Sequence, residues 1–339
     1  MAAFEQGASA EGAPAARDRR LMLFSGRANP DLAVAIAKDL GVPLGGVTLK
    51  TFSAGEVYCR YDESVRDTDV FIVQPTCNNP DTGMTANDAL VELLLMIDAA
   101  VGASAKRVIA VMPWFGYSRQ DKRSALREPI SARVVAHVLE TAGADRVLTV
   151  DLHAAQVQGF FTRPVDDMTA LLVLAKYFAD LKLDDLVIVS PDVGRVKLNH
   201  KFAEKVGADL ALMTKERPAH QVAEIGYVIG DVKGKTAVIV DDIIDSAGTL
   251  RAAAQTVLDE GAARVYAAAT HGLFSGNAYE NLAGVPFEQI VVTDTVPLLP
   301  GAPDNIVRLS LAGVLADSIR QIATGGSLSR GMSGENQLF

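Results

Sequence analysis

Short apolar runs alternate with helical patterns along most of this chain, and that alternation constrains its fold more than any other feature. The runs at 21–26, 69–76 and 107–114 are apolar throughout, which does not suit strands with one face in solvent. Between the first two runs, residues 29–41 have helical spacing, with Pro30 near the start of the expected helix. Buried strands separated by helices are typical of a mostly parallel sheet with helices on both faces. The sequence therefore predicts an α/β fold.

A local pattern recurs three times, at 102–113, 143–153 and 261–271, and indicates repeated helix–strand units. Each copy follows a helical segment and begins with Gly-Ala, followed by a basic residue, a valine and a short apolar strand. We interpret each glycine as the helix C-cap and the residues after it as the entry to a strand. The strand pattern is interrupted at 160–168, which favours a break between two related halves at that point.

The length of 339 residues supports this division, because a single core rarely grows past roughly 250–300 residues. The sequence predicts a disordered tail at 1–20, an N-terminal domain at 21–165, a C-terminal domain at 166–310, and a C-terminal helix with a tail at 311–339. Within the last segment, residues 314–327 have the pattern of an amphipathic helix that ends at glycines.

Composition argues against several classes of protein. A net charge of −9 argues against nucleic acid as a partner, since nucleic-acid binders concentrate Lys and Arg to neutralise phosphates. No apolar run approaches the roughly 18 residues that span a bilayer, so we expect no membrane partner. Cys59 and Cys77 form neither a disulfide framework nor a metal-binding CxxC, and we expect a cytoplasmic protein.

The strongest chemical signal is the segment 237–250. An apolar strand ends in Asp241 and Asp242, a loop of small residues follows at 245–249, and a helical pattern then begins. The unpaired N–H groups and the dipole at a helix N-terminus favour a bound anion, and the glycine lets a phosphate approach the backbone. Paired aspartates suit sugar hydroxyls or a hydrated Mg²⁺. The alternative is an acidic turn capped by Ser and Thr. In that case the order of strand, aspartates, small-residue loop and helix would have arisen by chance.

Other candidate residues follow expected strands, where ligands bind in open α/β sheets. His153 and Asp192 each end such a strand, although a lone histidine at a strand end is more often structural. Lys215 and Arg217 lie in 213–224, which contains proline, several charges and no clear periodicity, so we expect a mobile loop. Without further context, a solvated charged loop is the simpler interpretation of that segment.

The segment 237–250 closely resembles the binding signature for phosphoribosyl diphosphate (PRPP). That signature is shared by phosphoribosyltransferases, which consume PRPP, and by PRPP synthetases, which make it. Five further segments resemble the synthetases, in the order of that family: 113–123, 127–133, 146–161, 188–194 and 229–235. Because the similarity extends from about residue 21 to the C-terminal region, the chain is identified as a member of the phosphate-activated, Mg²⁺-dependent ribose-phosphate pyrophosphokinases.

This resemblance implies a fold, a reaction and several partners. The fold has two phosphoribosyltransferase-like domains, each a mostly parallel sheet flanked by helices. The reaction transfers the β,γ-diphosphoryl group of Mg-ATP to the anomeric hydroxyl of ribose 5-phosphate, giving PRPP and AMP. PRPP then serves purine, pyrimidine, histidine, tryptophan and NAD biosynthesis. The resemblance also implies Mg²⁺ as cofactor, inorganic phosphate as activator, and a homohexamer with active sites at subunit interfaces.

The resemblance also implies a role for each candidate residue. The ATP contacts are Phe52, Glu56, Arg119, Gln120, Asp121 and His153, of which Phe52 and Glu56 serve a neighbouring subunit. The Mg²⁺ ligands are His153 and Asp192. The ribose 5-phosphate contacts are Asp241, Asp242, Asp245, Ser246, Ala247, Gly248 and Thr249. The catalytic residues are Lys215 and Arg217, on a flap at about 213–226 that closes over the group being transferred.

Some positions depart from the family pattern. Ala54 stands where the family has an acidic or amide residue, Glu216 separates the two flap cations, and 193–199 replaces a run richer in glycine and arginine. Ala54 and the altered segments 77–88 and 124–130 touch regions tied to ATP or to the allosteric nucleotide, which leaves regulation by ADP and phosphate open. Ala54 and the altered flap also motivate one alternative, a catalytically silent regulatory subunit. A second alternative, a phosphoribosyltransferase, is opposed by the length of the chain and by the segment 113–123.

Overall fold

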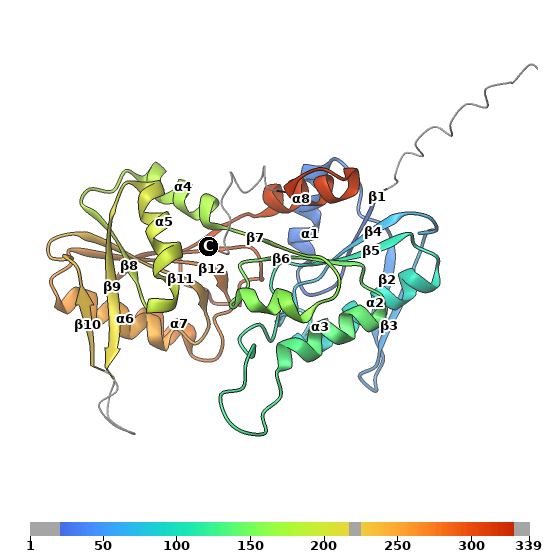
Figure 1. The fold of residues 1–339 in the computed structure, drawn as a ribbon, viewed down its shortest axis with the longest axis horizontal. Coiled ribbons are helices and arrows are strands. Elements are labelled where there is room, and N and C mark those ends of the chain that lie inside the picture. Colours follow the sequence, from blue (N-terminus) through green and yellow to red (C-terminus); the bar gives the residue numbers. More distant parts are fainter. Residues whose placement is uncertain (1–20, 217–224, 329–339) are drawn as a thin grey trace, which may run out of the picture.

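The computed structural model describes residues 21–216 and 225–328, which form two α/β halves lying side by side (Figure 1). Each half contains a mostly parallel sheet flanked by helices, as the alternation of apolar runs and helical patterns predicts. Within the described residues, no helix is both long enough and apolar enough to cross a membrane.

The first sheet has five parallel strands in the order β1-β4-β5-β6-β7. Its strands are β1 (Leu21–Ser25), β4 (Asp69–Val73), β5 (Arg107–Met112), β6 (Arg146–Val150) and β7 (Val165–Met168). Its helices are α1 (Pro30–Leu40), α2 (Ala86–Gly102) and α3 (Ser131–Ala142). Successive residues of β1 serve opposite faces: Leu23 packs in the cluster that contains α1, whereas Phe24 packs in the cluster of α2 and α3.

The expected interruption of the strand pattern at 160–168 is wrong for its last four residues, which form strand β7. Val165 pairs with Val147 of β6, so the first sheet continues to Met168. This strand is short, and two of its four residues are aspartates, of which Asp166 forms an ion pair with Arg146. A search for buried apolar runs therefore misses it. The domain limits at 165 and 166 remain a prediction, and the sheet itself extends slightly beyond them.

The second sheet has seven described strands in the order β10-β9-β8-β11-β12-β13-β14, and within this sheet β10 alone is antiparallel to its neighbour. Its strands are β8 (Leu186–Ser190), β9 (Asp209–Glu216), β10 (Ile225–Ile229), β11 (Thr236–Ile244), β12 (Arg264–Gly272), β13 (Phe287–Thr293) and β14 (Ile306–Leu309). Helices α4 (Leu171–Leu181) and α5 (Val196–Val206) cover one face, and α6 (Gly248–Asp259) and α7 (Ala278–Ala283) cover the other.

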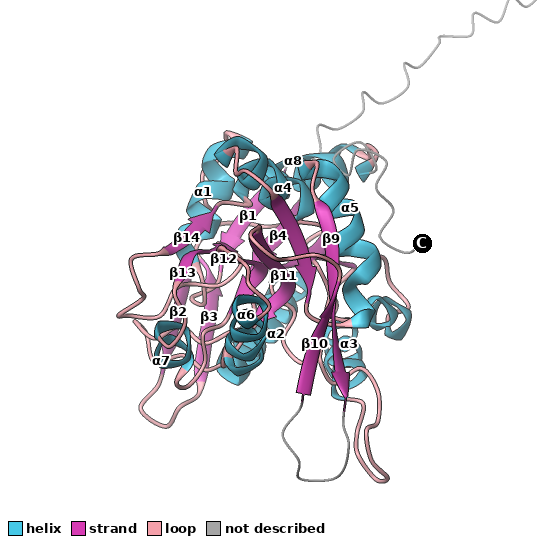
Figure 2. Ribbon diagram, turned by 90° about the vertical axis from the view of Figure 1, so that its left-hand side faces the viewer, coloured by secondary structure: helices cyan, strands magenta, loops and turns pink. Residues whose placement is uncertain are grey.

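The loop expected at 213–224 is partly wrong. Strand β9 continues to Glu216 and pairs with β10, with Lys215 opposite Gly226. The two strands form an arm that extends past the neighbouring helices (Figure 2). Charged residues are frequent at the end of β9 and conceal its strand character in the sequence. Arg217 lies outside the described residues.

The predicted glycine C-caps are confirmed only in part. Gly143 ends α3 with a φ of 108°, and Gly261 follows α6 with a φ of 92°, both in the left-handed region that glycine tolerates. Gly102 is instead the last helical residue of α2, and Ser104 takes the positive φ of 65°. The shared Gly-Ala pattern therefore marks the end of each helix without fixing which residue reverses the chain.

The two halves share a continuous core because the last described helix, α8 (Ala312–Thr324), packs on α1 in the first half. Figure 1 shows this pair, in red and blue, on the upper side of the first half. The buried cluster contains Leu23 of β1, Leu315 of α8 and Val238 of β11. A hydrogen bond from Asn29 Nδ2 to the carbonyl of Asp294, 2.8 Å long, adds a polar link. The expected amphipathic helix at 314–327 is confirmed, with Gly325 as its C-cap.

An ion pair between the half-buried Arg27 and the buried Glu92 in the first half gives a prediction about stability. The Glu92 side chain is 0% exposed, pairs with Arg27 Nε, and accepts hydrogen bonds from the Arg27 N–H at 2.8 Å and Gln74 Nε2 at 3.0 Å. Removing one partner of a buried pair leaves an uncompensated charge. We expect Arg27→Ala to lower the free energy of unfolding by about 3 kcal/mol, measured by urea denaturation.

Arg60→Ala is the matched control, because it removes an arginine from an exposed pair with Asp62. Exposed pairs contribute little, so the control should lose at most about 1 kcal/mol. Equal losses in the two variants would contradict a special role for burial at Glu92.

Candidate functional site

Most of the candidate residues meet in one cavity of about 350 Å³ at the carboxyl ends of β8 and β11. The first half supplies Arg119 and His153, and the second half supplies the rest. The candidate residues in its lining are Arg119, His153, Asp192, Asp241, Asp242, Asp245, Ser246, Ala247, Gly248 and Thr249. The structure therefore brings together residues that the sequence places in four separate segments.

The loop between β11 and α6 has the geometry of an anion site. Ala247 adopts a left-handed conformation with a φ of 60°, which turns the chain sharply so that α6 begins at Gly248. Asn281 of α7 fixes the turn, since its Nδ2 donates to the carbonyl of Ser246 at 2.8 Å. The side chains and N–H groups of this loop surround the N-terminus of α6, whose dipole favours negative charge.

Asp241 and Asp242, near the carboxyl end of β11, differ in the pKa values of their carboxyl groups. Burial, together with the charge of Asp242, raises the pKa of Asp241. Burial also acts to raise the pKa of Asp242, but the hydrogen bond from His153 and the charge of Arg195 overcome it and lower that pKa. The surroundings therefore favour negative charge on Asp242 more than on Asp241.

His153 follows β6 and faces the aspartate pair across the cleft between the halves. Its Nδ1 lies 2.8 Å from Asp242 Oδ2, and since a carboxylate oxygen can only accept, Nδ1 is the donor in this contact. The turn before it is held in place by Asp151, which has a φ of 42° and whose carboxylate accepts from Thr270 and from the N–H of Ala170. This arrangement fixes the direction of the imidazole.

Asp192 follows β8 and lines the same cavity as His153. One of its oxygens, Oδ1, accepts the N–H of Arg195 at 3.0 Å and caps a short turn of 3₁₀-helix (Val193–Arg195). Among the described residues, no three or more His, Cys, Asp or Glu side chains are grouped closely enough to hold a metal ion. Asp192 offers the oxygen ligand that Mg²⁺ prefers, and this ion usually keeps several waters and binds substrate phosphates through its remaining positions.

Arg119, Gln120 and Asp121 follow β5, and each faces a different region. Arg119 Nη1 forms an ion pair with Asp245 of the second half. Asp121 is buried, accepts from Gln156 Nε2, and lines a second cavity of about 490 Å³ that also contains Arg119, His153 and Asp192. Arg119 therefore links the cavities and joins the two halves.

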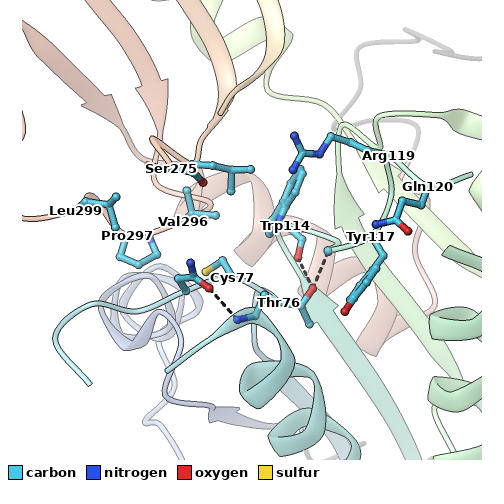
Figure 3. A pocket seen from close by; sticks show the side chains of 14 residues that line it. Thr76, Cys77, Trp114, Tyr117, Arg119, Gln120, Ser275, Val296, Pro297 and Leu299 are labelled. Carbon is cyan, nitrogen blue, oxygen red and sulfur yellow. Dashed lines mark hydrogen bonds between the residues drawn. The ribbon is translucent and has the colours of Figure 1, made fainter. Parts of the chain in front are cut away.

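Gln120 lines a third cavity, of about 240 Å³, between the halves (Figure 3). Trp114 and Tyr117 approach it from the first half, and Val296 and Pro297 approach it from the second. Trp114 is held by the ring of His271, whose centroid lies 4.7 Å away. This cavity combines aromatic and amide side chains, which suits a flat, partly polar ligand group.

Phe52 and Glu56 do not join these cavities. They lie at the end of an antiparallel hairpin, β2 (Val47–Thr51) and β3 (Val57–Tyr61), in the first half (Figure 1). From sequence alone, a phenylalanine is more often a core residue. The Phe52 side chain is nevertheless 45% exposed, and Lys50 Nζ lies 5.1 Å from its ring centroid. An exposed aromatic ring at a hairpin end is available to another molecule.

The flap residues are described only in part. Lys215 belongs to β9 through its backbone pairing with β10. Arg217 falls outside the described residues. The flap at about 213–226 and the catalytic role of both residues remain predictions.

Sequence reasoning misses one residue at the centre of the site. Arg195 forms an ion pair with Asp242 and donates to the carbonyl of His153 at 3.1 Å, so it contacts the aspartate pair and the histidine together. The segment 193–199 is identified in the sequence only as a departure from the family pattern. The available signal is its position, a few residues after strand β8 and Asp192.

Comparison with known proteins gives one family. Residues 21–143 match the N-terminal domain of ribose phosphate pyrophosphokinase, and residues 203–332 match the phosphoribosyl synthetase-associated domain. The ribose-phosphate pyrophosphokinase of Caldanaerobacter subterraneus subsp. tengcongensis is 48% identical over 312 residues, covering 91% of this chain and 97% of the relative. That of Clostridium perfringens is 47% identical over 308 residues, covering 90% and 95%.

A solved structure agrees with this result. The crystal structure of phosphoribosylpyrophosphate synthetase from Mycobacterium smegmatis matches with a TM-score of 0.83 and 43% identity, over 91% of this chain and 100% of that chain. The predicted fold class and the prediction of an enzyme are thereby confirmed. Sequence families, curated relatives and structure all lead to the conclusion that this chain belongs to the ribose-phosphate pyrophosphokinase family.

Proposed function

We propose that this enzyme transfers the β,γ-diphosphoryl group of ATP to the anomeric hydroxyl of ribose 5-phosphate, giving PRPP and AMP. One observation carries the proposal: a single cavity combines a phosphate-type loop and an aspartate pair from one half with Arg119 and His153 from the other. The two substrates are thus assigned to opposite walls of the cleft. Such transfer depends on in-line positioning and on cations around the moving group.

The sugar side of the site uses the second half. The loop from Asp245 to Thr249 binds the 5-phosphate with N–H groups, hydroxyls and the α6 dipole. Asp242 and Asp241 are assigned to hydrogen bonds with ribose hydroxyls. This arrangement leaves the anomeric oxygen directed to the cleft, where it attacks the β-phosphorus as the bond to the α-phosphate breaks.

The nucleotide side uses the first half. Arg119 offers a planar guanidinium to the phosphates, while Gln120 and Asp121 are assigned to ATP with His153. Phe52 and Glu56 are assigned to the adenine of a neighbouring subunit's site, which agrees with the exposure of Phe52. His153 and Asp192 would hold Mg²⁺, and the ion would neutralise charge on the phosphates. Lys215 and Arg217 are assigned to the transferring group.

The proposal includes a homo-oligomer, with a hexamer as the specific expectation. The outer surfaces of α2 and α3 support it, because Val91, Leu95, Val134 and Val138 are exposed there. Apolar side chains gathered on neighbouring helices are typical of protein–protein contacts. The proposal also includes activation by inorganic phosphate and a cytoplasmic location, which the two free cysteines support.

The test is AMP formation by the purified chain. We expect AMP to appear with ATP, Mg²⁺, inorganic phosphate and ribose 5-phosphate, and to vanish when the sugar is omitted. Omitting phosphate then tests activation. Nucleotide binding without AMP would favour the silent regulatory subunit, whereas phosphoribosyl transfer from PRPP to a base without ATP would favour a phosphoribosyltransferase. The names of the relatives support neither alternative.

A further inference from the structure

Arg195 forms an ion pair with Asp242, the carboxylate that is assigned to the ribose hydroxyls. Asp242 Oδ2 already accepts from His153 Nδ1 at 2.8 Å and pairs with Arg195 Nη2, so both lone pairs of this oxygen are engaged. The Asp242 side chain is only 3% exposed. With these contacts in place, Asp242 offers ribose 5-phosphate little more than its second oxygen.

The backbone of Arg195 is held in place by a hydrogen bond close to the site. Arg195 is the last residue of the short turn capped by Asp192 and directly precedes α5, and its N–H donates to Asp192 Oδ1 at 3.0 Å. The backbone is thus held, while the long side chain reaches back across the cleft to the carbonyl of His153 at 3.1 Å. The guanidinium contacts an acidic side chain from the second half and a strand end from the first half.

Arg195 also lines the cavity of about 490 Å³, together with three other cations, Arg119, Lys122 and Lys197. The carboxylates of Asp121, Asp151, Asp167 and Asp192 line it as well, so the cations do not create a free positive surface. An incoming polyphosphate brings several negative charges, and an arginine binds phosphate oxygens in bidentate fashion.

We infer that Arg195 is a positioning residue that couples the two substrate sites, by pairing with Asp242 when nucleotide is absent and with phosphates of the nucleotide when it is bound. The inference rests on the proposed function, since it takes Asp242 as a sugar contact. Its consequence is thermodynamic: nucleotide releases Asp242 and raises the affinity for ribose 5-phosphate. By linkage, the sugar raises the affinity for nucleotide by the same factor.

The test measures ribose 5-phosphate binding by calorimetry, alone and with Mg²⁺ and saturating α,β-methylene-ATP, whose α–β bridge cannot be cleaved. In the unmodified enzyme we expect the nucleotide to tighten sugar binding at least about fivefold, the lower end of usual coupling between sites. In Arg195→Ala we expect tighter sugar binding without nucleotide, and a coupling factor below about twofold. Arg195→Gln keeps a long side chain that can donate hydrogen bonds but removes the positive charge. Because the inference assigns the coupling to that charge, this variant should behave like Arg195→Ala.

Lys176→Ala is the matched control, because it removes an exposed cation that pairs with Asp180 on α4. It should keep the coupling factor of the unmodified enzyme. Unchanged coupling in Arg195→Gln, or weaker sugar binding by that variant without nucleotide, would overturn the inference and leave Arg195 a structural residue. AMP formation by the unmodified enzyme separates this failure from failure of the proposed function, because turnover with unchanged coupling removes only the role of Arg195.

Discussion

Replacing Lys215 with alanine is expected to lower kcat by about a thousandfold, with little change in the KM for ribose 5-phosphate. The group in transfer carries negative charge, and one preorganised donor aimed at such charge typically contributes about a hundredfold to a thousandfold. Lys215 is assigned here as one of two flap cations, and it lies on β9, which an antiparallel partner supports. AMP formation under saturating substrates, together with substrate KM values, provides the measurement.

Lys233→Ala is the matched control for Lys215→Ala. Lys233 is an exposed lysine in the turn before β11, away from the cavities described above. Its loss should leave kcat within about twofold, as expected for a surface substitution. Near-normal kcat in Lys215→Ala, with intact nucleotide binding, would remove the flap cation from the mechanism.

The second large effect is expected for Asp242→Asn, with a loss of about a hundredfold or more in kcat/KM for ribose 5-phosphate. Hydrogen bonds to a charged acceptor contribute about 1.5–3 kcal/mol each, and Asp242 is assigned to more than one hydroxyl. The amide also presents a donor group to Arg195 and His153, which are themselves donors to Asp242. Initial rates over a range of sugar concentrations give the ratio.

Asp166→Asn is the control for Asp242→Asn. It weakens another arginine–aspartate pair, with Arg146, on the short polar strand β7. Its kcat/KM should stay close to that of the unmodified enzyme, whereas a parallel loss in both variants would show that general destabilisation causes the effect. Removing the charge of Asp242 also removes one of the causes that raise the pKa of Asp241, so that pKa should fall in Asp242→Asn.

Structural features that depend on a single short segment can be predicted from this sequence. The segment 237–250 contains its strand, its aspartates, its small-residue loop and its helix start in order, and the structure places them as β11 and α6. The capping glycines Gly143 and Gly325 act within a few residues of their helices, so they too can be predicted.

Features that depend on distant segments are not predictable from local pattern. Strand β7 is polar, and it is held by pairing with β6 and by the ion pair between Asp166 and Arg146. The contact between Arg119 and Asp245 joins residues 126 positions apart, and that between His153 and Asp242 joins residues 89 positions apart. Arg195 is missed for the same reason, because its partners come from the ends of two other strands.

The packing of α8 on α1 has a consequence for synthesis on the ribosome. About 270 residues separate the end of α1 from the start of α8, so the two helices leave the ribosome about half a minute apart at about ten residues per second. Until α8 emerges, the apolar face of α1 lacks its cover. The first half therefore completes its core only near the end of translation, and the nascent chain has an interval in which a chaperone can bind that face.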